Sequence, residues 1–199
     1  MKNYIALLRI PQWSKNLFIF LPLFFALRFQ EPDRLLKVFL AFLGFCLLAS
    51  AVYIFNDLYD LKEDRRHPKK KDRPLPAGKI SKGAAIGLML CLLVLGLSMA
   101  YVLSLQMLYL CLLYIALNMA YSVWLKHIPI VDIMIIAVCF VIRIFVGGVV
   151  GDVPVYMWIV IMTFLLALFL SLGKRRDDVL IFIETNHMPR KSIDGYNLR

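Results

Sequence analysis

Residues 35–64 read LLKVFLAFLGFCLLASAVYIFNDLYDLKED. The first 21 of these residues carry a single charge, Lys37, whereas the last nine include three aspartates. An α-helix needs about 20 apolar residues to cross a hydrocarbon core about 30 Å thick. This stretch therefore predicts a membrane-spanning helix that ends in a cluster of carboxylates.

The rest of the chain repeats the apolar pattern. Of its 199 residues, 61% are hydrophobic, whereas about half are apolar in a soluble domain. The apolar residues fall in blocks that predict six spans, at 13–29, 35–55, 84–104, 105–125, 130–150 and 153–173. We expect an all-α membrane protein, a polytopic helical bundle of about six transmembrane helices, with one transmembrane domain over 1–178 and a polar tail over 179–199.

Positive charge is concentrated in particular connections between the predicted spans. Lys and Arg gather at the N-terminus and after the second, fourth and sixth spans, and such residues favour the cytoplasmic side. We therefore expect a multi-pass protein of the cell membrane with its N-terminus and aspartate-rich segment in the cytoplasm. The net charge of +10 does not indicate nucleic acid as a partner, because the basic residues lie between hydrophobic spans. The oligomeric state stays open.

Oxygen-bearing side chains follow the second span at helical spacing. On a helix, Asn56, Asp57, Asp60 and Asp64 fall within an arc of roughly 100°. Three carboxylates so close repel one another, and Mg²⁺, which binds carboxylates together with substrate phosphates, removes that repulsion. We predict that these four residues hold Mg²⁺ against a diphosphate; the alternative is an acidic helix end that only caps a span.

Cations lie beside this acidic segment. Arg66, Lys70 and Arg73 belong to a loop with three prolines, which suits a rigid, non-helical set of phosphate donors. Contact with lipid headgroups is an equal alternative for this loop. Lys126 ends the fourth span and Lys174 follows the sixth, and each either faces the same cavity or simply flanks the membrane.

Two charges lie within the fifth predicted span, where charges are costly and usually paired or functional. Asp132, near its cytoplasmic end, could join the metal or phosphate site. Arg143 lies deeper and needs a partner from another helix, in a structural or a substrate-binding role.

Taken together, these motifs resemble a known family. The pattern Asn-Asp-x-x-Asp-x-x-x-Asp, followed by Tyr121-Ser122 and Lys126, is similar to the UbiA superfamily of intramembrane prenyltransferases. The resemblance covers about residues 10–178. Several fuller strings are similar to the decaprenyl-phosphate phosphoribosyltransferase branch: Gln12-Trp13-Ser14-Lys15-Asn16, Asp64-Arg65-Arg66-His67-Pro68, Arg73-Pro74, Leu125-Lys126 and Leu172-Gly173-Lys174-Arg175-Arg176.

The resemblance implies an activity and a set of roles. It implies Mg²⁺-dependent transfer of 5-phosphoribose from phosphoribosyl diphosphate to a polyprenyl phosphate, with aromatic prenyl transfer from a polyprenyl diphosphate as the alternative. Asp57, Asp60 and Asp64 are then the candidate catalytic residues, and with Asn56 the metal ligands. The candidate substrate- and phosphate-binding residues are Lys15, Asn56, Arg66, Lys70, Arg73, Tyr121, Lys126, Arg143, Lys174 and Arg175.

The sequence departs from the family pattern in two places. The superfamily usually has nine spans, so a chain with six is expected to lack the last three. That departure adds a third alternative, an inactive truncated fragment or non-catalytic subunit. Asp178 also stands where the branch often has Glu.

Overall fold

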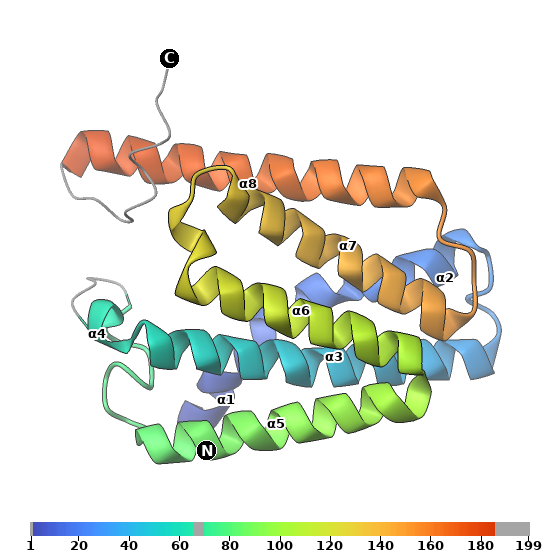
Figure 1. Cartoon of the computed structure of the whole chain (residues 1–199), viewed down its shortest axis with the longest axis horizontal. Helices are drawn as coiled ribbons and strands as arrows, with labels where there is room; N and C mark the ends of the chain where they lie inside the picture. Colours follow the sequence, from blue (N-terminus) through green and yellow to red (C-terminus); the bar gives the residue numbers. More distant parts are fainter. Residues whose placement is uncertain (1, 66–69, 186–199) are drawn as a thin grey trace.

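A computed structural model describes residues 2–65 and 70–185 (Figure 1). The regular secondary structure of the described residues is entirely helical, with no β-strand, which confirms the predicted all-α bundle. The elements are α1 (Lys2–Leu8), η1 (Ile10–Phe20), α2 (Leu21–Phe25), α3 (Pro32–Tyr59), α4 (Leu61–Asp64), α5 (Lys82–Leu103), α6 (Leu105–Val123), η2 (Leu125–His127), α7 (Val131–Gly151) and α8 (Met157–Thr185).

Five helices in the described part of the chain, α3, α5, α6, α7 and α8, are long and apolar enough to cross a membrane. They run along the long axis of the molecule, so that their ends gather at two poles (Figure 1). With 28 residues, α3 is about 42 Å long. Because the hydrocarbon core is about 30 Å thick, at least one end of α3 projects beyond it.

The first predicted span, 13–29, is not one α-helix. It begins as η1, an 11-residue 3₁₀ helix, and continues as the five-residue α2, with Pro22 in the first turn of α2. A 3₁₀ helix rises about 2.0 Å per residue, so η1 covers about 22 Å. The first span is therefore broken near Pro22, and the six predicted spanning helices become five continuous ones together with this broken segment.

A glycine on α7 explains how closely η1 packs against this helix. A Cβ on Gly147 would lie 1.9 Å from the carbonyl oxygen of Ile19, so only glycine lets the η1 backbone approach this closely. Helices α3 and α7 form the centre of the bundle, with 61% of their apolar windows buried against 17–22% for the outer helices α5, α6 and α8. The outer helices therefore present the broadest apolar surfaces.

The sixth predicted span continues further than expected. Helix α8 runs to Thr185, seven residues into the segment predicted as the polar tail. Residues 186–199 lie outside the described part of the chain.

One pole of the bundle is built around α4. A small apolar cluster packs α1, the end of α3, α4 and the start of α5 together, through Leu7, Leu61, Leu75, Ile80 and Ala85. Leu75 and Ile80 bury the connection before α5, which forms turns rather than a helix over 70–80. This packing fixes the loop that carries Lys70 and Arg73 beside α4.

Candidate functional site

The predicted acidic residues lie at the junction between α3 and α4. Helix α3 ends at Tyr59, Asp60 has φ −85° and ψ 7°, and a short helix then ends at Asp64. Asp57 and Asp64 are each only 2% exposed. Burying carboxylates to this degree is unfavourable unless they are paired, so their partners define the site.

The acidic arc divides into two pairs. Asn56 accepts a hydrogen bond of 3.0 Å from the Ser122 hydroxyl, and Asp60 lies 2.5 Å from Lys126 Nζ. These two residues therefore face the end of α6 and the start of η2. Asp57 and Asp64 face the loop before α5 instead, where Arg73 Nη1 contacts Asp57 at 3.2 Å and Asp64 at 3.0 Å.

Two further cations complete the pairing. Lys70 Nζ lies 3.2 Å from the Asp64 carboxylate. The guanidinium of Arg9 forms an ion pair with the Asp57 carboxylate and lies 5.1 Å from the centre of the Tyr53 ring. The three carboxylates thus meet four cations from three separate segments of the chain.

Arg9 is the residue of this cluster that the sequence did not single out. It lies in the turn between α1 and η1 with φ 52° and ψ 45°, the left-handed conformation, which costs a non-glycine residue about 1–2 kcal/mol. The turn is held by the Ser50 hydroxyl, which donates to Leu8 O and accepts from Trp13 Nε1. The available signal was a basic residue two positions before Pro11 and three before the Gln12–Asn16 string.

The cations predicted from the sequence separate into two groups. Lys70, Arg73 and Lys126 contact the carboxylates, whereas Arg66 lies outside the described residues. Tyr121 is half-buried and packs against the main apolar core. Lys15 lies on η1, Arg143 on α7, and Lys174 and Arg175 on α8.

Arg143 is buried between helices and contacts polar groups and aromatic rings of other helices. Its Nε donates to Asn16 Oδ1 at 2.8 Å, and its Nη2 lies 3.5 Å from the Tyr114 hydroxyl. The rings of Phe45, Tyr114 and Phe140 surround the guanidinium at 5.0–5.2 Å. These contacts give Arg143 a clear structural role, joining η1, α6 and α7.

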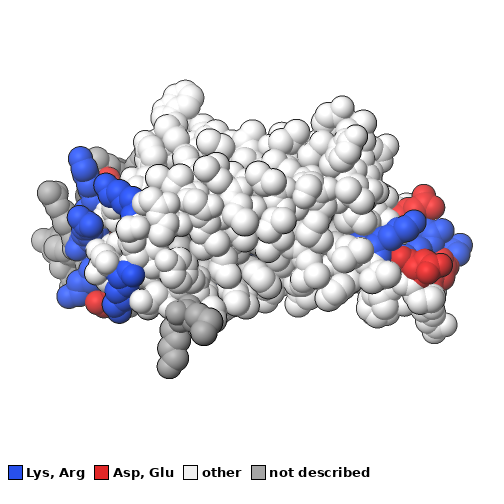
Figure 2. All heavy atoms as spheres, turned by 90° about the horizontal axis from the view of Figure 1, so that it is seen from below, with Lys and Arg blue, Asp and Glu red and all other residues white. Residues whose placement is uncertain are grey.

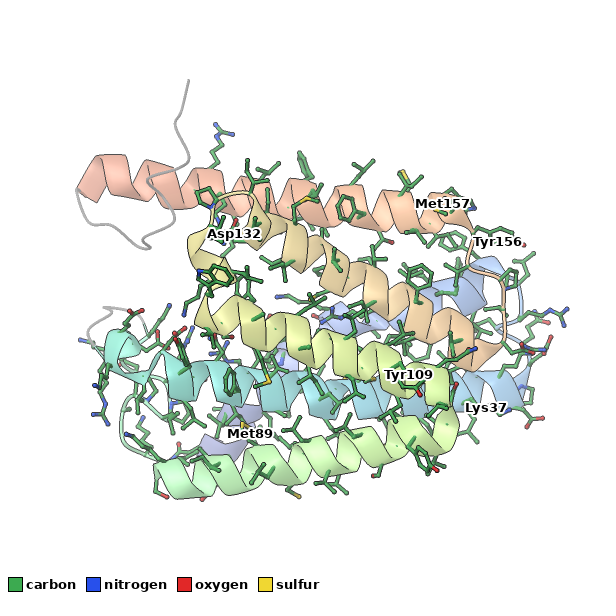
Figure 3. The ribbon with its side chains drawn as sticks, in the orientation of Figure 1. Lys37, Met89, Tyr109, Asp132, Tyr156 and Met157 are labelled. Atoms are coloured by element: carbon green, nitrogen blue, oxygen red, sulfur yellow. The ribbon has the colours of Figure 1, made fainter. Side chains whose placement is uncertain are left out.

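Arg175 and Asp132 form a second buried pair. Arg175 Nε and Nη2 lie 2.7 and 2.6 Å from the same oxygen of Asp132, at the α4 pole of the bundle (Figure 3). Asp132 is fully buried and Arg175 is 4% exposed. The pair joins α7 to α8, and the expectation that Asp132 could join the metal or phosphate site stays a prediction.

Lys15 lies beside an apolar hollow. Ser14, Phe18, Phe140, Thr163, Leu166, Ala167 and Leu170 line this hollow with it. The volume of the hollow is about 260 Å³, and it lies between η1, α7 and α8. The lysine is also within electrostatic range of Lys174, Arg143 and Arg9. A cation beside an apolar hollow suits an amphiphile with an anionic head.

The donor set at α3–α4 fits Mg²⁺. It consists of carboxylate and amide oxygens, the ligands that Mg²⁺ prefers. Asp57 and Asp64 present oxygens no more than about 6 Å apart, because one nitrogen of Arg73 contacts both. Within 2–65 and 70–185, no three His, Cys, Asp or Glu residues converge as a preformed metal centre. The carboxylates are instead held by the chain's own cations.

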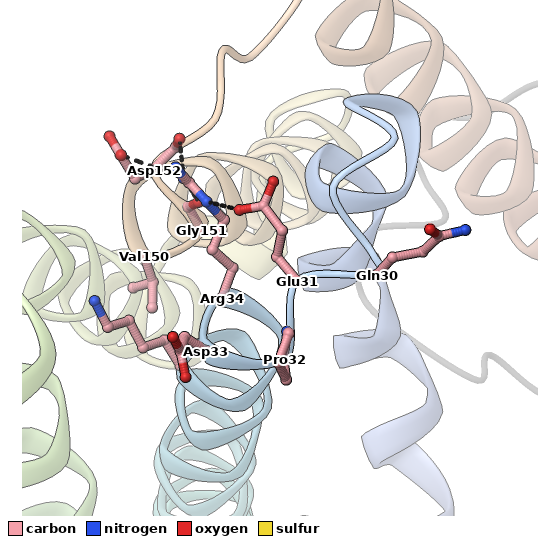
Figure 4. A pocket seen from close by; sticks show the side chains of 9 residues that line it. Gln30, Glu31, Pro32, Asp33, Arg34, Val150, Gly151 and Asp152 are labelled. Atoms are coloured by element: carbon pink, nitrogen blue, oxygen red, sulfur yellow. Dashed lines mark hydrogen bonds and ion pairs between the residues drawn. The ribbon is translucent and has the colours of Figure 1, made fainter.

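The opposite pole carries a different charged cluster. Figure 2 shows charged side chains at both ends of the molecule and an uncharged surface between them. This opposite end of the bundle, where α2 lies, is called the α2 pole. There Arg34 contacts Glu31, Gly151 O and Asp152 (Figure 4). These residues line a hollow of about 450 Å³.

Comparisons with known proteins agree with this architecture. The sequence profile of the UbiA prenyltransferase family matches residues 16–185. A decaprenyl-phosphate phosphoribosyltransferase of Mycolicibacterium smegmatis is 34% identical, over 96% of this chain and 62% of the relative. The Corynebacterium glutamicum protein of the same name is 33% identical, over 96% and 59%. The chain thus spans about three fifths of the length of these curated relatives.

Solved structures share the fold. A UbiA homologue from Archaeoglobus fulgidus, solved with DMAPP and Mg²⁺ bound, superposes with a TM-score of 0.77 at 24% identity, over 90% of this chain and 65% of that one. At this identity the similarity establishes the fold alone. Because the family profile covers most of the sequence, this chain is an integral membrane protein that belongs to the UbiA prenyltransferase family.

Proposed function

We propose that this protein transfers 5-phosphoribose from phosphoribosyl diphosphate to a polyprenyl phosphate. The observation that carries the proposal is the α4 pole, where buried Asp57 and Asp64 share Arg73 and are flanked by Arg9, Lys70 and Lys126. Carboxylates interleaved with cations suit a substrate that brings both a metal ion and a diphosphate. The relatives named for this activity, matched over nearly the whole chain, support the choice of donor and acceptor.

The reaction breaks one bond and forms another. The bond between ribose C1 and the diphosphate oxygen breaks, and an oxygen of the polyprenyl phosphate forms the new bond to C1. The diphosphate leaves with the electron pair, while the ring carbon carries positive charge in the transition state. Groups placed to stabilise the departing negative charge therefore accelerate the reaction.

The chain's own residues supply those groups. Asn56, Asp57, Asp60 and Asp64 would hold Mg²⁺, which neutralises negative charge on a diphosphate when it is bound. Lys126 and Arg73 lie on the two sides of the carboxylates and are placed to donate hydrogen bonds to phosphate oxygens. The guanidinium of Arg73 can donate in a fork, which suits a phosphate better than a point charge does.

The lipid acceptor requires a second feature. Lys15, and Lys174 within its electrostatic range, suit the phosphate of the acceptor, and the hollow lined by Phe18, Phe140 and Leu170 suits the start of its chain. The proposal puts the α4 pole in the cytoplasm, where a water-soluble sugar diphosphate is available. The Lys and Arg residues after the second, fourth and sixth predicted spans support that orientation.

An assay on membranes tests the proposal. Membranes containing the chain are incubated with phosphoribosyl diphosphate labelled in the ribose, a polyprenyl phosphate and Mg²⁺, and the lipid fraction is counted. The proposal predicts label in the lipid that depends on both substrates and on Mg²⁺. The same amount of label with Asp60→Asn as with the unmodified chain would contradict it.

Aromatic prenyl transfer is the second candidate, since the family to which the chain belongs is named for prenyl transfer. A polyprenyl diphosphate and a hydroxybenzoate or naphthoate acceptor, supplied to the same membranes, separate the two reactions. Product with these substrates alone would replace the first proposal. Product with neither donor would favour a non-catalytic role.

A further inference from the structure

The contact between Arg9 and Asp57 joins the start of the chain to the end of α3. Asp57 is 2% exposed, and its carboxylate pairs with Arg9 and with Arg73. Arg9 is positioned by groups outside the acidic cluster: the Tyr53 ring beneath it and the Ser50 hydroxyl that ties its turn to α3. Its guanidinium is therefore held on Asp57 by the fold around it.

The charge balance of the cluster indicates what this contact does. Asp57, Asp60 and Asp64 supply three negative charges, and the paired cations Arg9, Lys70, Arg73 and Lys126 supply four positive ones. A divalent metal ion entering alone would add two positive charges to a cluster that is already compensated. Bringing like charges together in this way is strongly unfavourable.

A diphosphate reverses that balance. Together with a metal ion it brings net negative charge, so the cations displaced from the carboxylates gain phosphate oxygens as new partners. Arg9 is suited to this exchange because, within the part of the chain that the structure describes, it forms an ion pair with Asp57 alone, whereas Arg73 bridges Asp57 and Asp64.

We propose that Arg9 is an internal counter-ion of the metal site, a positioning residue that holds Asp57 until metal and diphosphate enter together. The inference rests on the proposed function and adds a rule of binding to it: metal and diphosphate bind interdependently. By linkage, each raises the affinity for the other by the same factor. Arg9 supplies part of that coupling, because it opposes the metal alone and favours the diphosphate.

The test measures metal binding rather than turnover. The full chain, purified in detergent, is titrated with Mn²⁺ as a spectroscopic probe for Mg²⁺, with and without inorganic pyrophosphate, and free Mn²⁺ is followed by electron paramagnetic resonance. The coupling factor is the ratio of the two Mn²⁺ affinities. For Arg9→Gln, the affinity for Mn²⁺ alone should rise about tenfold and the coupling factor should fall by at least as much.

Three further variants separate charge from packing. Arg9→Lys keeps the charge and should retain coupling within about threefold of the unmodified chain. Ser50→Ala keeps the charge but loosens the turn, and should raise the affinity for Mn²⁺ alone by about threefold through loss of the two hydrogen bonds of the Ser50 hydroxyl. Arg28→Gln removes an arginine that is paired with a carboxylate at the other pole, and should leave both affinities unchanged.

The outcomes distinguish this inference from the proposed function. Coupled binding in the unmodified chain, with Arg9→Gln and Ser50→Ala both unchanged, would overturn the role of Arg9 and leave the proposed function standing. Arg9→Lys behaving like Arg9→Gln would assign Arg9 to packing on Tyr53 and also overturn the role. Failure of the unmodified chain to bind Mn²⁺ with pyrophosphate would overturn both proposals.

Discussion

The two poles of the bundle hold their charges in different ways. At the α4 pole, Asp57 is buried and pairs with Arg9 and Arg73, 48 and 16 residues away in the sequence. At the α2 pole, the Glu31 side chain is 39% exposed and pairs with Arg28 and Arg34, each three residues away. Local, exposed pairs form at little cost and contribute little. Buried pairs assembled from distant segments are costly to form, so the α4 pole is where a function is expected.

The largest expected effect comes from the carboxylates of the α4 pole. Asp57→Asn should lower the proposed phosphoribosyl transfer at least about 100-fold, because it removes a carboxylate that would hold a metal ion against the leaving diphosphate. The matched change at the α2 pole, Glu31→Gln, should leave the rate within about twofold of the original, since an exposed pair contributes little. The initial rate of label transfer into lipid measures both. Equal losses at the two poles would remove the contrast between them.

The next effect concerns stability. Asp132→Asn should destabilise the protein by about 3–5 kcal/mol, because Arg175 would keep a buried charge without its carboxylate. Asp152→Asn breaks the ion pair with Arg34 at the α2 pole, where the Asp152 side chain is 91% exposed, and should cost at most about 1 kcal/mol. Unfolding in mixed detergent micelles compares the two variants. Similar costs would show that burial does not distinguish these pairs.

A smaller effect is expected between the poles, where η1 is seated on α7. Gly147→Ala places a methyl group 1.9 Å from a backbone oxygen of Ile19 and should cost about 1–3 kcal/mol, since backbone cannot move aside cheaply. Gly87→Ala on α5 meets nothing within 4 Å and should gain up to about 1 kcal/mol from helix propensity. The thermal midpoint in detergent measures both changes, and a neutral Gly147→Ala would argue against this seating of η1.

The smallest expected effect is a pH dependence at the α2 pole. The hydrogen bond from Arg28 holds the pKa of Glu31 below its ordinary value of 4.5. A carboxylate with a lowered pKa stabilises the fold above its ordinary pKa, and that contribution disappears as the pH falls through the lowered value. The difference in thermal midpoint between the unmodified chain and Glu31→Gln should therefore be present at neutral pH and shrink below pH 4.5.

Salt should reduce the same difference in thermal midpoint between the unmodified chain and Glu31→Gln. Raising the salt from about 0.1 M to about 1 M shortens the Debye length from about 10 to about 3 Å, so the difference at neutral pH should shrink. A difference that grows in acid would contradict the assignment of this pair.

The sequence predicted the parts of the fold that depend on local pattern. Blocks of about 20 apolar residues located the five continuous spanning helices. The spacing of Asn56, Asp57, Asp60 and Asp64 predicted one continuous helical face, whereas the helix breaks at Asp60 and Asp64 lies on α4. The close packing of η1 on α7 was not predictable in this way, because it depends on Gly147, more than 120 residues further along the chain than Ile19.

The charge partners were harder to predict for the same reason. Arg9 looked like one of several cytoplasmic cations, and its contact with Asp57 follows from a left-handed turn held by Ser50 and Tyr53. The sequence placed Asp132 near the cytoplasmic end of its span, at the same pole as the acidic residues. Nothing in the sequence of α7 indicated that Arg175 of α8 would be its partner. Periodicity shows which face of a helix is polar, whereas tertiary packing decides which segments meet that face.

The most direct test of the α4 pole is a binding measurement. Isothermal titration of the purified chain with inorganic pyrophosphate, with and without Mg²⁺, asks whether the carboxylates hold a metal–diphosphate complex. We expect binding that requires Mg²⁺, that is lost in Asp60→Asn and that is unchanged in Glu31→Gln. Pyrophosphate binding that is equally tight without Mg²⁺, or that survives Asp60→Asn, would contradict the assignment of this pole.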